Sequence, residues 1–566
     1  MSLTRRGALI GGIGLAAAGL GALVTRTQTR PRLRVAPARE RPNLLLIVTD
    51  QERARHLLPA AVRLPQRDRL MARSTVFRQA MTTSNLCSTA RGTLYSGQHP
   101  QNNGLWENAP LPYAPPLAPH VPTLGSLLQD VGYHTAYFGK WHLSRVPTRH
   151  GSGERGMREL LRAYGFETSA QDGERDGTHH GHIHDPSTAR TSARFVHAAA
   201  DQERPWFAAV NFVNPHDVMF FSTGPEQVRS RLSPFPDRVL PAPDDALYRT
   251  PLDVDLPDTF GPATLAGKPA AHTAFQQVWD LALGRIPFDD RDAWRAYWHY
   301  YLHCLQDVDR HLQTVLDAVR DSGQGDRTVI VFTSDHGEMG GVHGLRDKGA
   351  SLYREASQVP LWIAHPEVEG GSSTDALSSH VDLVPTLLRL AGVEGSVLRE
   401  QAPYLIGTDL TPALSRSADR GLEATGRDAV LSQWTSLVHQ SPEAARAFDD
   451  VSERGLVGKA GLLRDERVWT ALDARGQMRG LFDGRFKFAR YFSPRRHHTP
   501  RDFETLVADN DLELYDTDLD PGETTNLAVH PERHRQRLEA LSARLDQLVA
   551  REVGTDDGRH YPFWQA

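Results

Sequence analysis

The sequence lacks the features that define several classes of protein, namely many cysteines, an excess of basic residues and internal repeats. It has only two cysteines among 566 residues, so a disulfide framework cannot hold it together. Its formal net charge is −5, without the basic excess of a protein that binds nucleic acid, and we find no internal repeats. What remains is ordinary globular composition, with 39% hydrophobic and 23% charged residues. The chain is long enough for two packed domains of unequal size.

The N-terminus has the features of an export signal. Met1–Arg6 ends in a pair of arginines, and the weakly hydrophobic run Gly7–Val24 and the small-residue site Ala36–Ala38 follow. We therefore predict that residues 1–38 are a twin-arginine-type signal that sends the protein to the periplasm or the cell exterior. The alternative is an uncleaved membrane anchor, since the run is about long enough to span a bilayer, but its glycine content favours a signal.

Three short apolar runs predict strands that are buried on both faces of a parallel sheet. They are Asn43–Thr49, Trp206–Val213 and Thr328–Ser334. Polar side chains follow each run, and the sites of α/β folds lie at the carboxyl ends of such strands. Between them, Tyr301–Val319 has leucine and valine at helical spacing, which makes Cys304 most simply a core residue.

The last part of the chain has a different character. Gly480–Tyr491 alternates as a hairpin does, Leu512–Asp516 predicts another short strand, and Leu538–Leu548 carries one apolar helix face. We therefore predict a catalytic α/β domain over residues 41–400 and a smaller antiparallel β domain with a terminal helix over residues 425–566.

Two polar segments are predicted to form the rim of the site. Residues 223–290 are rich in proline and aperiodic, which predicts loops. The histidines at positions 179, 180, 182 and 184 look like a transition-metal tract, but their Gly, Asp and Arg-rich surroundings favour a solvated loop over a second metal site. Neither segment contains a pattern that names a ligand, and no pattern predicts an oligomeric state.

Cys87 follows a polar stretch and precedes a helix-compatible segment that ends at Gly97. It should therefore lie near a helix N-terminus, where backbone N–H groups favour negative charge. Arg91 is one helical turn further on, so both side chains can reach the same anion. A lone cysteine is more often a small buried apolar residue, and it is this context that makes Cys87 a candidate for a chemical role.

Two pairs of polar residues stand at the ends of two predicted strands. Asp50 and Gln51 follow the first strand, and Asp335 and His336 follow the last. Together they offer three oxygens and one imidazole, a set that suits Ca²⁺, Mg²⁺ or Mn²⁺. Each residue alone could simply cap its strand, but two such pairs predict a divalent-cation site.

The run that begins at Cys87 resembles the signature of the sulfatase family, in which a maturation enzyme oxidises the cysteine of Cys-x-Pro-x-Arg to formylglycine (3-oxoalanine). The match departs from the family at Thr89, where proline is usual. The resemblance implies the alkaline-phosphatase-like fold, a large mixed and mainly parallel sheet sandwiched by helices. It also implies that Cys87 and the two strand-end pairs are metal ligands. Asp-Gln with Asp-His is similar to the pattern of choline sulfatases and phosphonate monoester hydrolases.

The resemblance implies roles for further residues. Lys140 and His142 lie in a Gly-Lys-Trp-His motif whose lysine contacts the sulfate and whose histidine supports the nucleophile. Lys348 matches a second sulfate-binding lysine. His216, in Asn-Pro-His-Asp, matches the histidine that binds the ester or protonates its leaving oxygen. Asn108 is similar to an asparagine that hydrogen-bonds the sulfate in some relatives.

The implied chemistry neutralises and positions an anionic ester. The cation, the two lysines and Arg91 would hold the sulfate in line. One hydroxyl of the hydrated aldehyde would attack sulfur, and deprotonation of the other by Asp335 or His142 would expel sulfate. His216 or Lys348 would protonate the departing alcohol.

Three functions stay open from the sequence. The leading prediction is an exported, Ca²⁺-bound, formylglycine-dependent hydrolase of a small-molecule sulfate monoester. The pair of Gln51 and His336 keeps a phosphonate monoester or phosphodiester hydrolase, with the same nucleophile and Mn²⁺, as an alternative. The third hypothesis is that Thr89 blocks maturation and that the protein is a non-catalytic binding relative.

Overall fold

The computed structural model describes residues 41–561 apart from residues 110, 112, 147–152, 172–176, 229–237, 262–264, 415–420, 422–423, 454–465 and 497–498. The predicted export signal, residues 1–38, lies outside the described residues. None of the helices in the described part has the length and apolar character that crossing a bilayer requires.

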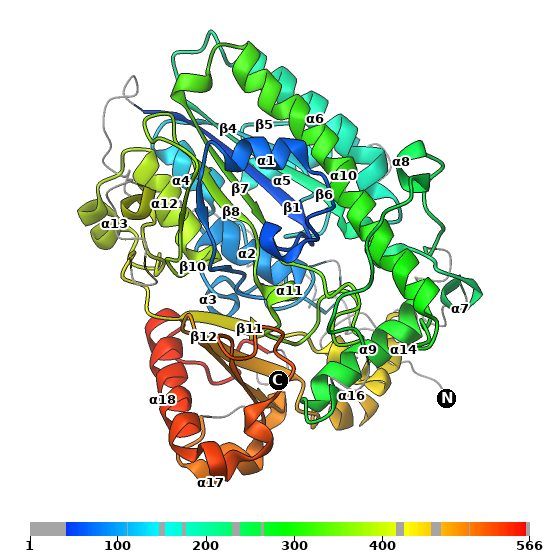
Figure 1. Cartoon of the computed structure of the whole chain (residues 1–566). Coiled ribbons are helices and arrows are strands. Elements are labelled where there is room, and N and C mark those ends of the chain that lie inside the picture. The colour runs from blue at the N-terminus through cyan, green and yellow to red at the C-terminus, as the bar shows by residue number, and fades with distance from the viewer. Residues whose placement is uncertain are drawn as a thin grey trace, which may run out of the picture.

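An eight-stranded sheet forms the centre of the larger part of the molecule (Figure 1). Its strands are, in order across the sheet, β5 (Thr168–Ser169), β4 (His134–Gly139), β6 (Trp206–Pro215), β1 (Asn43–Asp50), β7 (Thr328–Ser334), β8 (Leu361–Ala364), β2 (Thr75–Phe77) and β9 (Ser372–Thr374). All adjacent strands are parallel except that β8 runs antiparallel to both of its neighbours. The three predicted strands are confirmed, and so is the mixed, mainly parallel fold class.

The side chains of β1 alternate between two hydrophobic clusters, because successive residues of a strand point to opposite faces. Leu44, Leu46 and Val48 enter one cluster, and Leu45 and Ile47 enter the other. Helices cover both faces, which explains why the strand is apolar at every position. The first cluster is completed by α2 (Cys87–Ser96), α4 (Leu124–Asp130), α5 (Gly153–Ala163) and α12 (Leu383–Leu390), and the second by α1 (Pro65–Met71), α6 (His180–Ala198) and α10 (Arg291–Asp321).

Two expectations about helices are only partly met. The helix predicted over Tyr301–Val319 exists but is longer, as α10, and Cys304 is fully buried in it as expected. The prediction that residues 223–290 are all loops is wrong for α9 (Ala270–Leu283). This helix buries residues at positions 271, 275, 278 and 282, a spacing of one helix face. Shorter helices in the same region are α7 (Pro225–Val228) and α8 (Ala246–Arg249), and η3 (His216–Phe220) lies just before it.

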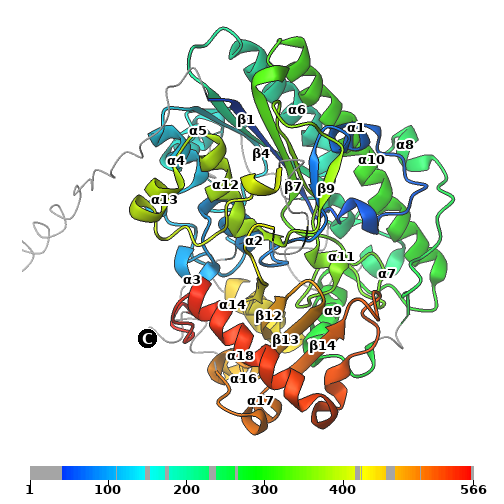
Figure 2. The same cartoon turned by 60° about the vertical axis from the view of Figure 1, so that its left-hand side comes forward.

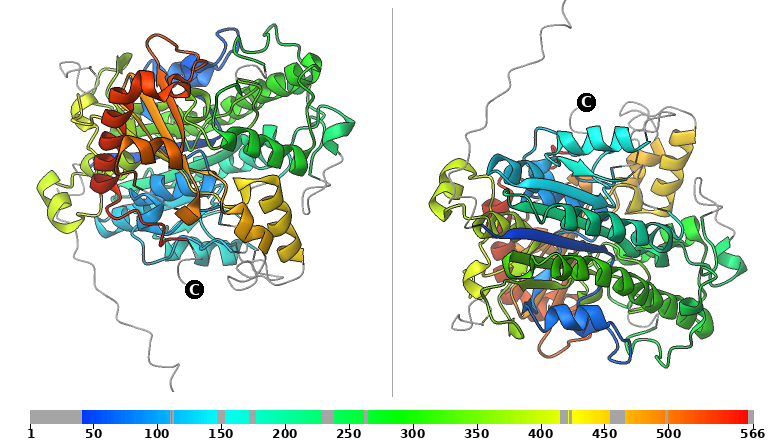
Figure 3. Two further views of the ribbon diagram at one scale, coloured as in Figure 1. Left: turned by 90° about the horizontal axis from the view of Figure 1, so that it is seen from below. Right: turned by 90° about the horizontal axis from the view of Figure 1, so that it is seen from above.

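The smaller sheet is antiparallel throughout, as predicted (Figure 2). Its strands are β11 (Val430–Trp434), β12 (Gln477–Phe482), β13 (Phe486–Phe492) and β14 (Asp511–Asp516). The terminal helix α18 (Arg535–Glu552) and α17 (Phe503–Asp509) share a hydrophobic cluster with it. Seen from below in Figure 3, α18 and these strands, in red and orange, lie nearest the viewer.

The remaining elements are short. On the larger part they are η2 (Arg55–Leu57), β3 (Ala80–Met81), α3 (Pro100–Asn103), η5 (Gly325–Arg327), α11 (Arg354–Ser357), β10 (Ser378–Ser379), η6 (His380–Asp382), α13 (Gly395–Gln401) and η7 (Thr411–Leu414). Around the smaller sheet they are η8 (Val438–Gln440), α14 (Pro442–Glu453), α16 (Glu466–Ala471), η9 (Pro494–Arg496), η10 (Leu527–Val529) and η11 (Pro531–His534).

The two sheets are joined by buried polar contacts. Arg427 forms ion pairs with Asp382 of η6 and with Glu552 of α18, and His99 also contacts Glu552. The backbone N–H of Gln433 in β11 donates to the carbonyl oxygen of Thr83, just before α2. In Figures 1 and 2, α2 accordingly lies between the central sheet and the smaller sheet.

Candidate active site

The strand-end residues meet at one point. Asp50 ends β1, and Asp335 and His336 follow directly after β7, the parallel neighbour of β1. Cys87 begins α2 and reaches the same point from one face of the sheet. Single ligand atoms of these four residues all lie within 4.8 Å of one another, and all four side chains are buried. The sequence prediction that they converge agrees with this geometry.

The carboxylates at this point have oxygens without hydrogen-bond donors in the described part of the chain. Asp335 Oδ1 accepts the N–H groups of Gln51 and His336, whereas its Oδ2 has no hydrogen bond and only an ion-pair contact with Arg91 at 3.5 Å. Asp50 Oδ1 also has no hydrogen bond. A buried carboxylate oxygen without a donor is costly unless a cation is coordinated there. Two such oxygens beside an imidazole therefore fit a divalent cation.

Gln51 is held by two acidic residues that the sequence analysis missed. Its φ of 73° lies in the left-handed region. Its Nε2 donates to Glu338 Oε2 and, at 3.2 Å, to Asp347 Oδ1. Because both partners are acceptors, the amide oxygen points the other way, where Lys348 Nζ lies 3.3 Å from Oε1. Gln51 therefore presents an oxygen toward the site, as a metal ligand must.

The thiol of Cys87 contacts the ammonium group of Lys348 and the imidazole of His336. Its Sγ lies 2.9 Å from Lys348 Nζ and 3.1 Å from His336 Nε2. Burial raises the pKa of the thiol to about 12, and the positive charge of Lys348 opposes that shift. The unmodified side chain is therefore a protonated thiol at neutral pH, which is not the nucleophilic form of cysteine.

The first turn of α2 is tied to the surrounding loops by hydrogen bonds. Thr89 Oγ1 donates to the carbonyl oxygen of Leu86 at 2.8 Å, and Ser88 Oγ donates to the carbonyl oxygen of His142 at 2.6 Å. The side-chain oxygen of Asn108 accepts the N–H of Ser88 at 3.2 Å. Asn108 thus contacts the residue that follows Cys87.

Three ion pairs surround position 87: Lys140 with Asp50 at 2.7 Å, Arg91 with Asp335 at 3.5 Å, and Lys348 with Asp347 at 3.6 Å. These charges balance, so a bound divalent cation would leave the site with a surplus of positive charge. That surplus suits an anionic ester. The sequence prediction placed Arg91 on the anion, whereas its guanidinium contacts an acidic side chain and the carbonyl oxygens of Lys140 and Trp141.

His142 and His216 follow β4 and β6, two other strands of the central sheet. Both are nearly fully buried, and His142 has a φ of 56°. Burial raises the pKa of Asp50, but the positive charges of Lys140 and then His216 outweigh burial and hold it below its usual range. The charge of His216 is thus among those that act on the carboxylate that ends β1.

The histidine-rich segment is helical, not a loop. His180 begins α6, and the carboxylate of Asp217 accepts the N–H groups of Gly181 and His182 in its first turn. In return, Asp185 of α6 accepts two N–H groups at the end of β6. The loop prediction failed because the capping acid comes from a distant part of the chain. In the described part of the chain, no second metal-ligand cluster includes these histidines.

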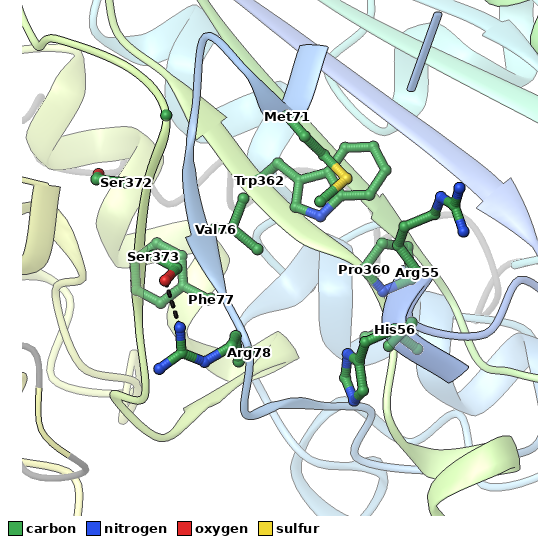
Figure 4. A pocket seen from close by; sticks show the side chains of 13 residues that line it. Arg55, His56, Met71, Val76, Phe77, Arg78, Pro360, Trp362, Ser372 and Ser373 are labelled. Atoms are coloured by element: carbon green, nitrogen blue, oxygen red, sulfur yellow. Dashed lines mark hydrogen bonds between the residues drawn. The ribbon is translucent and has the colours of Figure 1, made fainter. Parts of the chain in front are cut away.

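A separate hollow of about 310 Å³ lies at the β2, β8 and β9 side of the central sheet (Figure 4). Met71, Val76 and Trp362 form its apolar wall, and Arg78 is hydrogen-bonded to Ser373 at its border. None of the candidate site residues lines this hollow, so it does not belong to the site around Cys87.

Comparison with known proteins gives a consistent result. The model of the sulfatase family matches residues 42–393. "Uncharacterized sulfatase YidJ" of Escherichia coli K12 is 28% identical over 381 residues, which cover 63% of this chain and 69% of the relative. The choline-sulfatase of Rhizobium meliloti is 27% identical over 436 residues and covers 72% of this chain and 76% of its own.

Solved structures share the fold. A 2-O GAG sulfatase superposes with a TM-score of 0.62 at 22% identity and covers 92% of this chain and 94% of its own. The phosphonate monoester hydrolase of Agrobacterium radiobacter superposes with a TM-score of 0.59 at 22% identity and covers 91% and 96%. At this identity, the likeness establishes the architecture only.

Proposed function

The chain belongs to the sulfatase family, and from this premise we propose that it hydrolyses sulfate monoesters with a formylglycine made from Cys87. The observation that carries the proposal is the meeting of Cys87 with two strand-end carboxylates and an imidazole, with Lys348 against its Sγ. Such a site can hold an anionic ester beside a nucleophile. The hydrated aldehyde would supply a hydroxyl for attack on sulfur and a second hydroxyl whose ionisation releases sulfate.

We propose Ca²⁺ as the cation, with Mg²⁺ and Mn²⁺ as alternatives, because most of the available donors are oxygens. Asp50, Gln51, Asp335 and His336 would hold it together with the group at position 87. The cation would neutralise charge on the ester and on the nucleophile. Arg91 contacts Asp335 at 3.5 Å and would keep that carboxylate oriented.

The remaining residues would bind the ester and handle its protons. Lys140 and Lys348 would bind the sulfate oxygens, and the side-chain amide of Asn108 would add a hydrogen bond. His216 or Lys348 would protonate the leaving oxygen, and His142 or Asp335 would accept the proton that is lost when sulfate is expelled. These assignments agree with the buried positions of all these residues except Asn108, which is partly exposed.

Conversion of Cys87 must precede folding in this proposal. The side chain is only 2% exposed, so a maturation enzyme cannot reach it in the folded protein. We also propose that residues 1–38 direct export of the folded, converted protein. The units over residues 41–400 and 425–566 would then act together, because the second unit packs beside Leu86 and Glu107 of the first.

The test is a comparison of matched esters with the converted protein. We expect a higher kcat/KM for nitrophenyl sulfate than for the corresponding phosphate diester and phosphonate monoester, and no turnover by Cys87→Ala. The reverse order of kcat/KM would establish the phosphonate or phosphodiester hydrolase, which the Gln51 and His336 pair keeps as the second candidate.

A further inference from the structure

Lys348, the residue whose ammonium group contacts Cys87, lies in a loop. The loop runs from the end of β7 at Ser334 to the start of α11 at Arg354. Gly349, the next residue after Lys348, has a φ of 92°, in the left-handed region. A lysine side chain is long and flexible, so a loop backbone does not by itself hold the ammonium group in one place. The position of Lys348 therefore depends on the contacts that its loop makes with other segments.

Asn85 makes such a contact from the segment that leads to the nucleophile. It stands just before Leu86 and Cys87 in the chain, and it is only 4% exposed. Its Nδ2 donates to the carbonyl oxygen of Gly349 at 3.0 Å and to that of Ser351 at 2.8 Å. These two carbonyl groups follow closely after the sulfate-binding lysine of the loop. One side-chain amide therefore joins that loop to the start of α2.

The two carbonyl oxygens determine which way the amide of Asn85 points. Both can only accept a hydrogen bond, so the group that faces them must be the NH₂ of the amide, which has a hydrogen for each. If the amide were reversed, its oxygen would face two other oxygens, and the buried carbonyl groups would lose their donor. Both hydrogens of Asn85 are therefore used, one on Gly349 and one on Ser351.

The segments on both sides of this contact are themselves hydrogen-bonded. Next to Asn85, the N–H of Leu86 donates to Ser84 Oγ at 3.2 Å, which fixes the backbone that carries the amide. On the other side, the N–H of Ser351 donates to the carbonyl oxygen of Gly349 at 3.0 Å. The two residues that accept from Asn85 thus form one tight turn. The amide holds this turn as a unit against the approach to α2.

We propose that Asn85 is a positioning residue, which holds the loop of Lys348 at the distance from position 87 that the reaction needs. The ammonium group of Lys348 lies 2.9 Å from Cys87 Sγ, and the bond from Asn85 to the carbonyl oxygen of Gly349 fixes the backbone from which that lysine extends. This inference rests on the proposed sulfatase function. Asn85 acts through Lys348 and not on the ester itself.

The test is a double-variant cycle on nitrophenyl sulfate, with every rate divided by the fraction of position 87 that peptide mass analysis finds converted. Asn85→Leu removes both donors without adding charge and should lower kcat/KM by about 10–100-fold, the effect of displacing a catalytic group by about 1 Å. In a Lys348→Ala background, the same change should alter kcat/KM by no more than about twofold. An equal fold loss in both backgrounds would show a structural role and overturn the inference.

Asn526→Leu is the matched control, because Asn526 makes the same kind of contact with other segments. Its Nδ2 donates to the carbonyl oxygens of Gly267 and Leu512, both at 2.9 Å, and its Oδ1 accepts two further N–H groups. This variant should lose at least as much stability as Asn85→Leu but keep kcat/KM within about twofold of the wild type. A similar loss of kcat/KM in both variants would contradict the inference. Asn85→Ser keeps one donor and should lose less activity, and it replaces the leucine variant in the cycle if that variant does not fold.

Failure of the proposed function can be recognised separately, because hydrogen–deuterium exchange of the loop needs no turnover. Asn85→Leu should exchange faster than the wild type over residues 349–353, and Asn526→Leu should not. If this difference is seen in a protein that hydrolyses no sulfate ester, Asn85 still fixes the loop and only the proposed reaction is wrong. Unchanged exchange in Asn85→Leu would overturn the inference whatever the activity.

Discussion

The ammonium group of Lys348 lies 2.9 Å from Sγ of Cys87, across a separation of 261 residues in the chain. The contact places a fixed positive charge against the atom that, after conversion, bears the attacking oxygen. It also leaves Lys348 beside the anion that a sulfate ester would bring. Charge at this position is therefore expected to act on the transition state more than on folding.

Lys348→Ala should lower kcat/KM for nitrophenyl sulfate by about 10²–10³, the usual effect of removing one preorganised group that stabilises developing charge. Lys348→Arg keeps the charge and should lose less. Steady-state kinetics on fully converted protein measure both. Arg155→Ala removes a positive charge from an exposed position of α5 and serves as the control, with unchanged kinetics. Unchanged kinetics in Lys348→Ala would contradict the role.

Glu338→Gln should weaken metal binding by about 10–100-fold, because it removes an acceptor that fixes the amide of Gln51. The measurement is a calorimetric Ca²⁺ titration of the purified protein, which does not depend on turnover. Glu367→Gln, an exposed position, is the control. If both variants bind Ca²⁺ as the wild type does, Gln51 is not a ligand oriented by Glu338.

Thr89→Pro should fold and should raise the fraction of Cys87 that is converted. Thr89 is the third residue of α2, and proline is tolerated in a first helical turn because no N–H there has an intrahelical partner. The lost hydroxyl contacts would cost about 1 kcal/mol each. Peptide mass analysis after co-expression with the maturation enzyme measures the fraction. A lower fraction than in the wild type would mean that proline does not improve recognition of this chain.

Glu552→Gln should reduce the free energy of unfolding at pH 7 by about 3 kcal/mol. Burial raises the pKa of Glu552, but Arg427 and His99 outweigh burial and lower it to about 2. This pKa is lower in the folded than in the unfolded protein. The stabilisation that the ionised carboxylate provides is therefore present above pH 4.5 and is lost as the pH falls toward 2.

Denaturant unfolding of wild type and Glu552→Gln between pH 2 and 7 tests this pH dependence. The difference between their free energies of unfolding should shrink toward zero at the acidic end. Glu539→Gln, half-exposed on the same helix, should differ from the wild type by no more than about 0.5 kcal/mol. A difference for Glu552→Gln that does not change with pH would contradict the account.

The sequence predicted the parts of the site that depend on local patterns. Asp50 and Asp335 end apolar strands, and parallel strands bring their carboxyl ends to one edge, so their meeting follows from the strand pattern alone. Cys87 was placed at a helix N-terminus from its polar approach and the helix-compatible residues after it. The smaller sheet followed from the alternation around Asp483 and from the apolar face of the last helix.

What the sequence did not predict depends on contacts between distant segments. Glu338 and Glu107 look like ordinary surface acids in the sequence, yet each is fully buried because its acceptors are used by partners far along the chain. The start of α6 at His180 was missed because its cap, Asp217, follows a later strand.

The measurement that tests the account most directly is the mass of the peptide that contains Cys87, from protein made together with a formylglycine-generating enzyme. The account predicts a loss of about 18 Da relative to cysteine, the change from thiol to aldehyde that creates the nucleophile, and sulfate release in proportion to the converted fraction. An unmodified thiol in protein that nevertheless hydrolyses sulfate esters would contradict the mechanism. An unmodified thiol without activity would identify a binding relative in which Thr89 blocks maturation.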